Sequence, residues 1–294
     1  MMNDSSIRDT FSHSVAPFIH HLLTTQNDVH TMSHLILIVG IVFALIVEWI
    51  QFISEGVNTQ RWIINLLFIL SALVLSSDYL APIETTWHAI DGLSLSFLQT
   101  VTGNNDPLFL SKWIDDRLMR LITDDVSILT DPIHLIVLTT LWHICAFLIE
   151  ITLYVAGVWA LWGKVLIELL GLVFVPCLAW SSLRPFFDVY VRLYFGFLML
   201  LIMLRATSAL AAITINAEFS TLGLGCHGQF RCLLTGATPI ALTNHLELLV
   251  VMVLCVALVL SSFKMAYHFA QSCGAASNGA IQIAKKAAMM LAAL

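Results

Sequence analysis

The stretch Leu35–Ile53 reads LILIVGIVFALIVEWIQFI and contains one ionisable residue, Glu48. A helix needs roughly 20 mostly apolar residues to cross the hydrocarbon core of a bilayer. Lipid offers the backbone no hydrogen-bond partners, so an apolar run without strand alternation indicates a helix, whose backbone groups bond to one another. The sequence therefore predicts a membrane-spanning helix over His34–Ile53.

The composition of the whole chain agrees with this prediction. Of 294 residues, 59% are hydrophobic and 11% are charged. Soluble domains have roughly 45–50% apolar and about 25% charged residues, so lipid is the solvent that suits this chain. We expect an all-α, multi-pass membrane protein with about 5–6 transmembrane helices and additional amphipathic interfacial helices.

Further apolar runs predict the remaining spans. The tract Ile133–Trp180 exceeds the length of one span, and glycines beside interfacial tryptophans indicate a break near Gly163, which gives two spans there. The other predicted spans are Trp62–Leu80, Phe187–Ile213 and His245–Phe269. The predicted regions are residues 1–33 (amphipathic segment), 34–80 (two spans), 81–132 (central hydrophilic loop), 133–270 (transmembrane bundle with loop 216–244) and 271–294 (small-residue tail).

The central loop contains an amphipathic pattern in LFLSKWIDDRLMRLI, residues 108–122. Its apolar side chains share one helical face, and its charged side chains lie away from that face. One interpretation is a helix that lies on the bilayer or packs on the bundle. The other is an element that contacts a substrate or partner through Lys112, Trp113, Arg117 and Arg120.

Ionisable residues within the spans also have two interpretations. Glu150, Glu168 and Arg205 fall in predicted helices, where charges are costly and usually pair with one another. We expect ion pairs between helices, such as Glu150 or Glu168 with Arg205. The alternative is a proton relay through His143 and Glu150, which share a helix face and would suit a proton-coupled small-molecule transporter.

The polar loop GLGCHGQFRCLLTG holds Cys226 and Cys232. Glycines around the pair make a disulfide feasible, and a disulfide would need an oxidising compartment. Two free thiols are the other interpretation. The chain has no P-loop, GxGxxG, HExxH or GxSxG motif, so we expect no enzymatic activity, and we predict no metal or cofactor site.

The segment between two of the spans is the most specific feature of the sequence. Gly171 precedes Pro176, which ends helical hydrogen bonding near the end of its span. Arg184 follows at a turn, where it can reach lipid headgroups or helix-terminal carbonyls. Phe187 and Tyr190 recur at helical spacing in the next span. These five residues form a hinge between two helices.

This hinge resembles that of the TrbL family, the multi-pass inner-membrane subunits of bacterial type IV secretion and conjugal transfer systems. Gly171, Pro176, Arg184 and Phe187 match the family pattern, and Tyr190 stands where the family has tryptophan. The order of amphipathic segment, two spans, central loop and cluster of spans is also similar. The resemblance implies a non-enzymatic channel or scaffold subunit that assists translocation of DNA or protein and pilus assembly.

The resemblance also implies location, partners and topology. We expect a multi-pass protein of the bacterial inner membrane that forms a homo-oligomeric ring. Its expected partners are other inner-membrane and pilus-tip-type subunits, secretion ATPases, the DNA or protein substrate, and lipid. An external amino terminus is implied, whereas the distribution of basic residues favours an internal one. We expect loops 81–132 and 216–244 to be periplasmic, with one predicted span re-entrant or interfacial.

Overall fold

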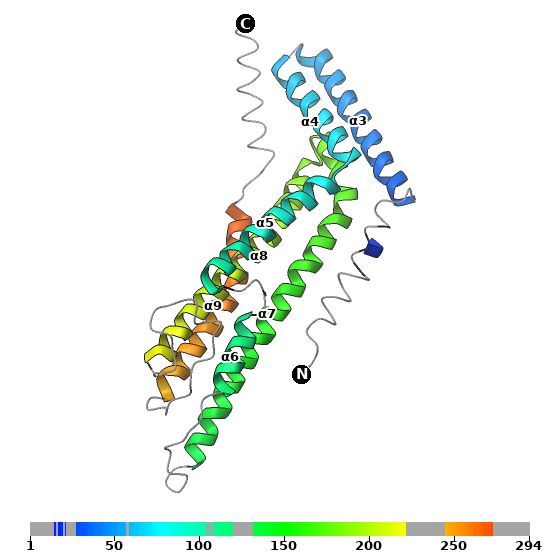
Figure 1. Cartoon of the computed structure of the whole chain (residues 1–294). Helices are drawn as coiled ribbons and strands as arrows, with labels where there is room; N and C mark the ends of the chain where they lie inside the picture. The colour runs from blue at the N-terminus through cyan, green and yellow to red at the C-terminus, as the bar shows by residue number, and fades with distance from the viewer. Residues whose placement is uncertain are drawn as a thin grey trace. The chain divides into compact units, whose positions relative to one another are not determined.

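The part of the chain that the computed structural model describes is helical. It covers residues 28–56, 59–103, 106, 109–119, 132–221 and 245–272, together with 15, 17–19 and 21. The helices are α3 (Asp28–Glu55), α4 (Thr59–Ser77), α5 (Leu80–Thr102), α6 (Phe109–Met119), α7 (Pro132–Phe174), the 3-10 helix η2 (Pro176–Ala179), α8 (Arg184–Thr221) and α9 (His245–Ser272) (Figure 1). The predicted all-α class is confirmed.

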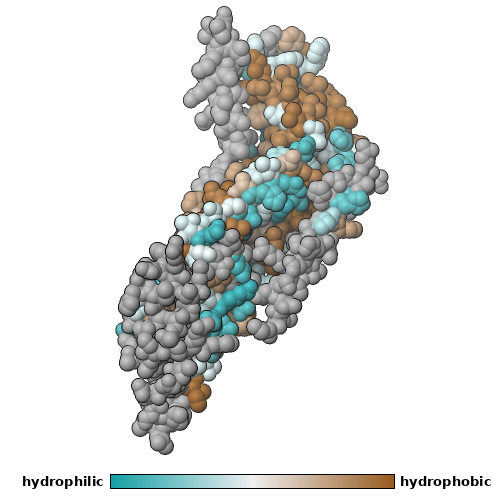
Figure 2. Space-filling view, viewed as in Figure 1, coloured by the Kyte–Doolittle hydropathy of each residue, from teal (hydrophilic) through white to brown (hydrophobic). Residues whose placement is uncertain are grey.

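Five of these helices are long and apolar enough to cross a membrane, so the chain is a multi-pass membrane protein. The candidate spans are His30–Ser54, Thr59–Ser77, Thr139–Phe174, Arg184–Ser220 and Glu247–Gln271. Apolar side chains such as Ile38 and Ile53 remain 60% and 71% exposed on α3. Figure 2 shows a largely hydrophobic surface over α3 and α4. Such a surface is stable in contact with lipid tails.

The predicted break in the tract Ile133–Trp180 is wrong, because α7 continues without interruption to Phe174. A glycine inside a helix costs only about 1 kcal/mol relative to alanine, and no proline lies between Pro132 and Pro176. Gly163 serves packing instead: a Cβ at this position would overlap the ring of Phe197 on α8. One long helix thus replaces two predicted spans, which leaves five candidates.

The prediction of a loop over residues 81–132 is also wrong in its first half. α5 occupies Leu80–Thr102, and only α6 corresponds to the predicted amphipathic helix. The buried side chains of α5 recur at intervals of four or seven residues, as one helix face requires. They are Ile83, Trp87, Ser94, Leu98 and Thr102. Polar residues on the opposite face conceal this periodicity.

The first of two compact units comprises Met1–Trp87, Leu161–Phe197 and Phe269–Leu294. Its core packs α3 and α4 against η2. The members of this core are Leu37, Ile64, Phe68, Ala72, Leu178 and Ala179. The hinge between α7 and α8 therefore packs against the α3–α4 hairpin.

The second unit comprises His88–Ala160 and Leu198–His268. Helix α6 inserts its apolar face among α7, α8 and α9. Trp113 of α6 meets Phe219 of α8 edge-on, with ring centroids 5.8 Å apart. Other members of this core are Leu110, Ile114, Leu118, Trp142, Ile149, Leu153, Ile215, Leu248, Met252 and Val259. The interpretation of α6 as a helix packed on the bundle agrees with this core.

Candidate functional site

The hinge between α7 and α8 contains Gly171 and Pro176 at its start and Arg184 at its end. Pro176 opens η2 directly after α7, where its missing N–H ends the ladder of helical hydrogen bonds. The last helical turn closes with a bond of 3.0 Å from the Val175 N–H to the Gly171 carbonyl. Residues Pro176–Ala179 are all buried. The hinge is thus a fixed corner within the first unit.

Two tyrosines hold the end of α7 at this corner. The Tyr190 hydroxyl donates to the Ile167 carbonyl at 3.2 Å, and the Tyr79 hydroxyl donates to the Glu168 carbonyl at 3.0 Å. Gly171 lies between their side chains: a Cβ there would stand 2.5 Å from the Tyr79 ring and 3.0 Å from the Tyr190 hydroxyl. Burial, with the nearby Glu168 carboxylate, raises the pKa of Tyr79, so its hydroxyl remains a donor.

Arg184 is buried at the start of α8 and binds the hairpin across the hinge. Its Nη2 donates to Asn65 Oδ1 at 2.8 Å, and its Nε donates to the Leu178 carbonyl at 3.3 Å. The guanidinium carbon lies 3.9 Å from the centre of the Phe68 ring, a cation–π contact. Asn65 in turn donates to the carboxylate of Glu48. We name Arg184, Asn65, Glu48 and Phe68 the arginine clasp.

Loss of the arginine clasp should loosen the hairpin. In Arg184→Met, Asn65 Oδ1 and the Leu178 carbonyl lose a donor, and a buried polar group left unsatisfied costs about 1–3 kcal/mol. We expect the free energy of unfolding, measured by denaturant titration in micelles with circular dichroism, to fall by about 2 kcal/mol. Arg184→Lys should recover part of this loss, because it retains the charge without the planar fork.

Arg61→Met is the matched control for this prediction. Arg61 also contacts the clasp, with its Nε 3.5 Å from Glu48 Oε1, yet its side chain is 44% exposed. Exposed ion pairs contribute about 0–1 kcal/mol. If Arg61→Met and Arg184→Met lower the free energy of unfolding equally, burial of the Arg184 guanidinium adds nothing to stability.

A second buried arginine lies in the other unit. Arg205 of α8 donates to the Asp91 carbonyl at 2.7 Å and also binds the Asp91 carboxylate and the Ser94 hydroxyl of α5. The structure thus gives Arg205 a partner that the sequence analysis did not name. Of the two predicted partners, Glu150 is exposed on α7, and Glu168 lies 3.5 Å from Lys164 one turn away. His143 is exposed on α7 as well.

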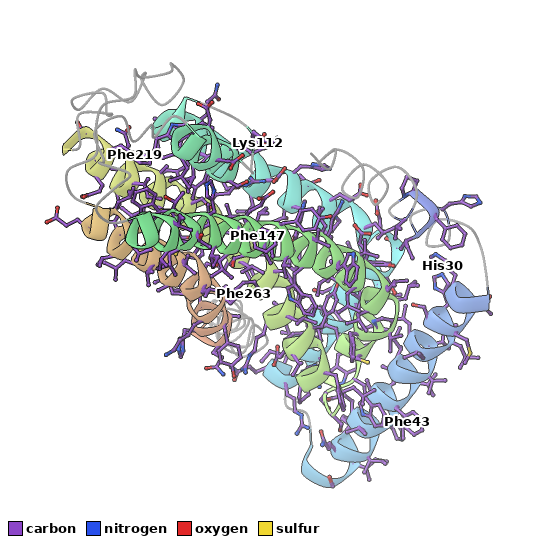
Figure 3. All side chains as sticks on the ribbon, turned by 90° about the horizontal axis from the view of Figure 1, so that it is seen from below. His30, Phe43, Lys112, Phe147, Phe219 and Phe263 are labelled. Carbon is purple, nitrogen blue, oxygen red and sulfur yellow. The ribbon has the colours of Figure 1, made fainter. Side chains whose placement is uncertain are left out.

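The residues predicted to contact a substrate divide into three groups. Trp113 is buried in the core of the second unit, so it is a packing residue. Lys112, labelled in Figure 3, is exposed on α6. Its Nζ lies 2.7 Å from Asp106 Oδ2. Arg117 falls within α6, and Arg120 lies outside the described residues. Lys112 is therefore the predicted contact whose accessibility the structure supports.

The cysteine predictions fall partly outside the described residues. Cys226 and Cys232 lie in the segment between α8 and α9 that the structure leaves undescribed. Cys145, Cys177 and Cys255 are buried free thiols. Among the described residues, no three His, Cys, Asp or Glu side chains gather as metal ligands would.

Asp91 and Asn65 are the polar partners that the sequence analysis missed. Ile83, Trp87, Ser94 and Leu98 lie four or seven positions apart, and this helical spacing is the sequence signal that would have revealed α5. Asn65 gave no such signal, since a single polar residue in an apolar run is common. Comparison with family models, curated proteins and solved structures finds no match to this chain.

Proposed function

We propose that the chain is a channel or scaffold subunit of a type IV secretion system in the bacterial inner membrane. The observation that carries the proposal is the TrbL-like hinge. Its residues Gly171, Pro176, Arg184, Phe187 and Tyr190 lie at one corner of the first unit, where the rings of Phe187 and Tyr190 are tilted against each other with centroids 6.1 Å apart. The multi-pass helical architecture accords with such a subunit.

In this role the protein assembles with copies of itself and with other subunits of the machine. Long apolar helices hold it in the bilayer, and α6 presents its polar face away from the core of the second unit. Lys112, Asp115 and Asp116 are exposed on that face and suit contact with a polar substrate or partner. Catalysis is left to the secretion ATPases.

Deletion of the gene tests the proposal directly. Transfer of a DNA or protein reporter to recipient cells should stop and should return with the wild-type chain. The purified protein should form a ring of identical subunits and co-purify with other secretion subunits. A monomer that drives substrate flux in liposomes, and loses this flux in Glu150→Gln, would instead identify a transporter.

Charge reversal on α6 tests the contact surface. We expect Lys112→Glu to reduce transfer roughly tenfold while assembly persists, because a like-charge contact at an interface costs more than about 1.4 kcal/mol. The double variant Lys112→Asp with Asp106→Lys exchanges the two charges and retains their ion pair. It should remain defective; if it restores transfer, the ion pair within the chain matters and Lys112 contacts no partner.

A further inference from the structure

The hinge between α7 and α8 lies against the middle of α3. The candidate span of α3 is His30–Ser54, so Gly40 and Phe43 are close to its midpoint. A Cβ built on Gly40 would be 3.8 Å from the Ala179 Cβ and 3.9 Å from the Pro176 carbonyl oxygen. The ring of Phe43, labelled in Figure 3, stacks on Trp180 with centroids 5.0 Å apart.

The same hinge lies against the middle of α4. Phe68 is at the centre of the candidate span Thr59–Ser77, and the Arg184 guanidinium covers its ring. The hydrocarbon core is about 30 Å thick, and a helix rises about 1.5 Å per residue. If α3 and α4 both cross the bilayer, the hinge lies near the midplane, about 15 Å from either headgroup region.

The hinge includes polar, non-helical chain at this depth. Ser181 and Ser182 are exposed in the turn between η2 and α8, where the Leu183 N–H bonds to the Trp180 carbonyl at 2.9 Å. Non-helical backbone does not face lipid tails; at membrane depth it is buried in protein or lines water. Exposed serines in such a turn therefore need a polar environment on their open side.

Polar side chains continue from the hinge toward the turn that joins α3 and α4. Arg184 bonds to Asn65, Asn65 bonds to Glu48, and Arg61 lies 3.5 Å from Glu48. Arg61 lies in the first turn of α4 and is partly exposed. This series of polar groups indicates the side of the membrane from which the hinge is hydrated.

We propose that water reaches the hinge residues Ser181 and Ser182 inside the membrane, from the side on which the α3–α4 turn lies. The arginine clasp forms the polar border of this hydrated region, and the outward faces of α3 and α4 remain in lipid. The inference rests on the spans and on the hinge contacts, so it holds whichever role a multi-pass protein with this hinge performs.

Cysteine accessibility tests the proposal in the full chain within native membranes. All six cysteines are first replaced by alanine or serine, and Ser182→Cys is introduced. A membrane-impermeant, cationic methanethiosulfonate reagent is applied to intact cells and to inverted vesicles. Ser54→Cys, near the end of α3, reports which side carries the α3–α4 turn. Ser182→Cys should react from that same side only.

Val42→Cys is the matched control. Val42 is 48% exposed and lies beside Phe43, at the depth of the hinge, but on an apolar face. We expect Ser182→Cys to react at least about tenfold faster than Val42→Cys, because the reagent attacks a thiolate and a thiol in lipid does not ionise. Modification after denaturation in SDS confirms that both cysteines are present.

Three results would overturn the proposal. If Ser182→Cys resists the reagent from both sides yet reacts after denaturation, protein covers the hinge. If Val42→Cys reacts as fast as Ser182→Cys, the middle of α3 is in water and the assumed depth is wrong. If Ser182→Cys reacts only from the side opposite Ser54→Cys, the polar series does not mark the entrance. None of these readouts depends on substrate transfer.

Discussion

Replacement of Asp91 by leucine should lower the free energy of unfolding by about 3 kcal/mol, because it leaves a buried guanidinium without its anion. Arg205 has a side chain only 5% exposed, whereas that of Asp91 is 30% exposed. Removal of the arginine instead leaves a carboxylate that water can reach. We therefore expect a smaller loss, about 1–2 kcal/mol, in Arg205→Met. Denaturant titration in micelles measures both.

The double variant tests whether the two side chains act as a pair. Asp91→Leu with Arg205→Met removes both charges, so its loss should be smaller than the sum of the two single losses. Arg192→Met, which changes an exposed arginine on the same helix, should change the free energy of unfolding by less than about 0.5 kcal/mol. Strictly additive losses would mean that the Asp91–Arg205 contact contributes nothing to stability.

Addition of one methyl group at Gly171 should destabilise the protein by about 2–3 kcal/mol. The new Cβ would stand 2.5 Å from the Tyr79 ring, which is buried and held by its bond to the Glu168 carbonyl. Tyr190, on the other side, is buried and bonded to Ile167. Both side chains are buried and hydrogen-bonded, so Gly171→Ala forces α7 or the tyrosines to shift. The same titration in micelles measures the effect.

Gly157 provides the matched control on the same helix. A Cβ at Gly157 meets nothing within 4 Å, and alanine favours a helix by about 1 kcal/mol over glycine. Gly157→Ala should therefore stabilise the protein slightly, while Gly171→Ala destabilises it. Effects of the same sign and size at both positions would contradict the close packing of the tyrosines at Gly171. If Gly171→Ala does not fold, its membrane insertion and its yield are compared with those of Gly157→Ala instead.

The two arginines show where prediction from the sequence stopped. The sequence marks Arg205 as a costly charge within an apolar run and places Arg184 at a turn between two spans. Their partners were missed: Arg184 bonds to Asn65, which is 119 positions away in the chain, and Arg205 bonds to Asp91, which is 114 positions away. No local spacing connects residues so far apart. The nearby carboxylates at 150 and 168 were more obvious choices, and the structure places them elsewhere.

The sequence predicts the residues of the hinge, but the environment that it predicts for Arg184 is wrong. Pro176 and Gly171 end α7 as the sequence predicts, because the effect of proline on helical hydrogen bonds is local. Arg184 was expected to reach headgroups or helix-terminal carbonyls from an interfacial turn. It does bond to the Leu178 carbonyl, yet it is buried against Asn65 and Phe68 in the α3–α4 hairpin. Only the packing of separate helices decides that environment.

The sequence by itself determined that this is a multi-pass helical membrane protein, since apolar length and periodicity are properties of neighbouring residues. It located α3, α4 and α9 closely and identified the buried face of α6. The tertiary structure decided that α7 is one helix, which side chains pair with the buried arginines, and that the hinge meets the middle of the α3–α4 hairpin. These features depend on contacts between helices that are distant in the chain, and such contacts leave no mark on local hydropathy.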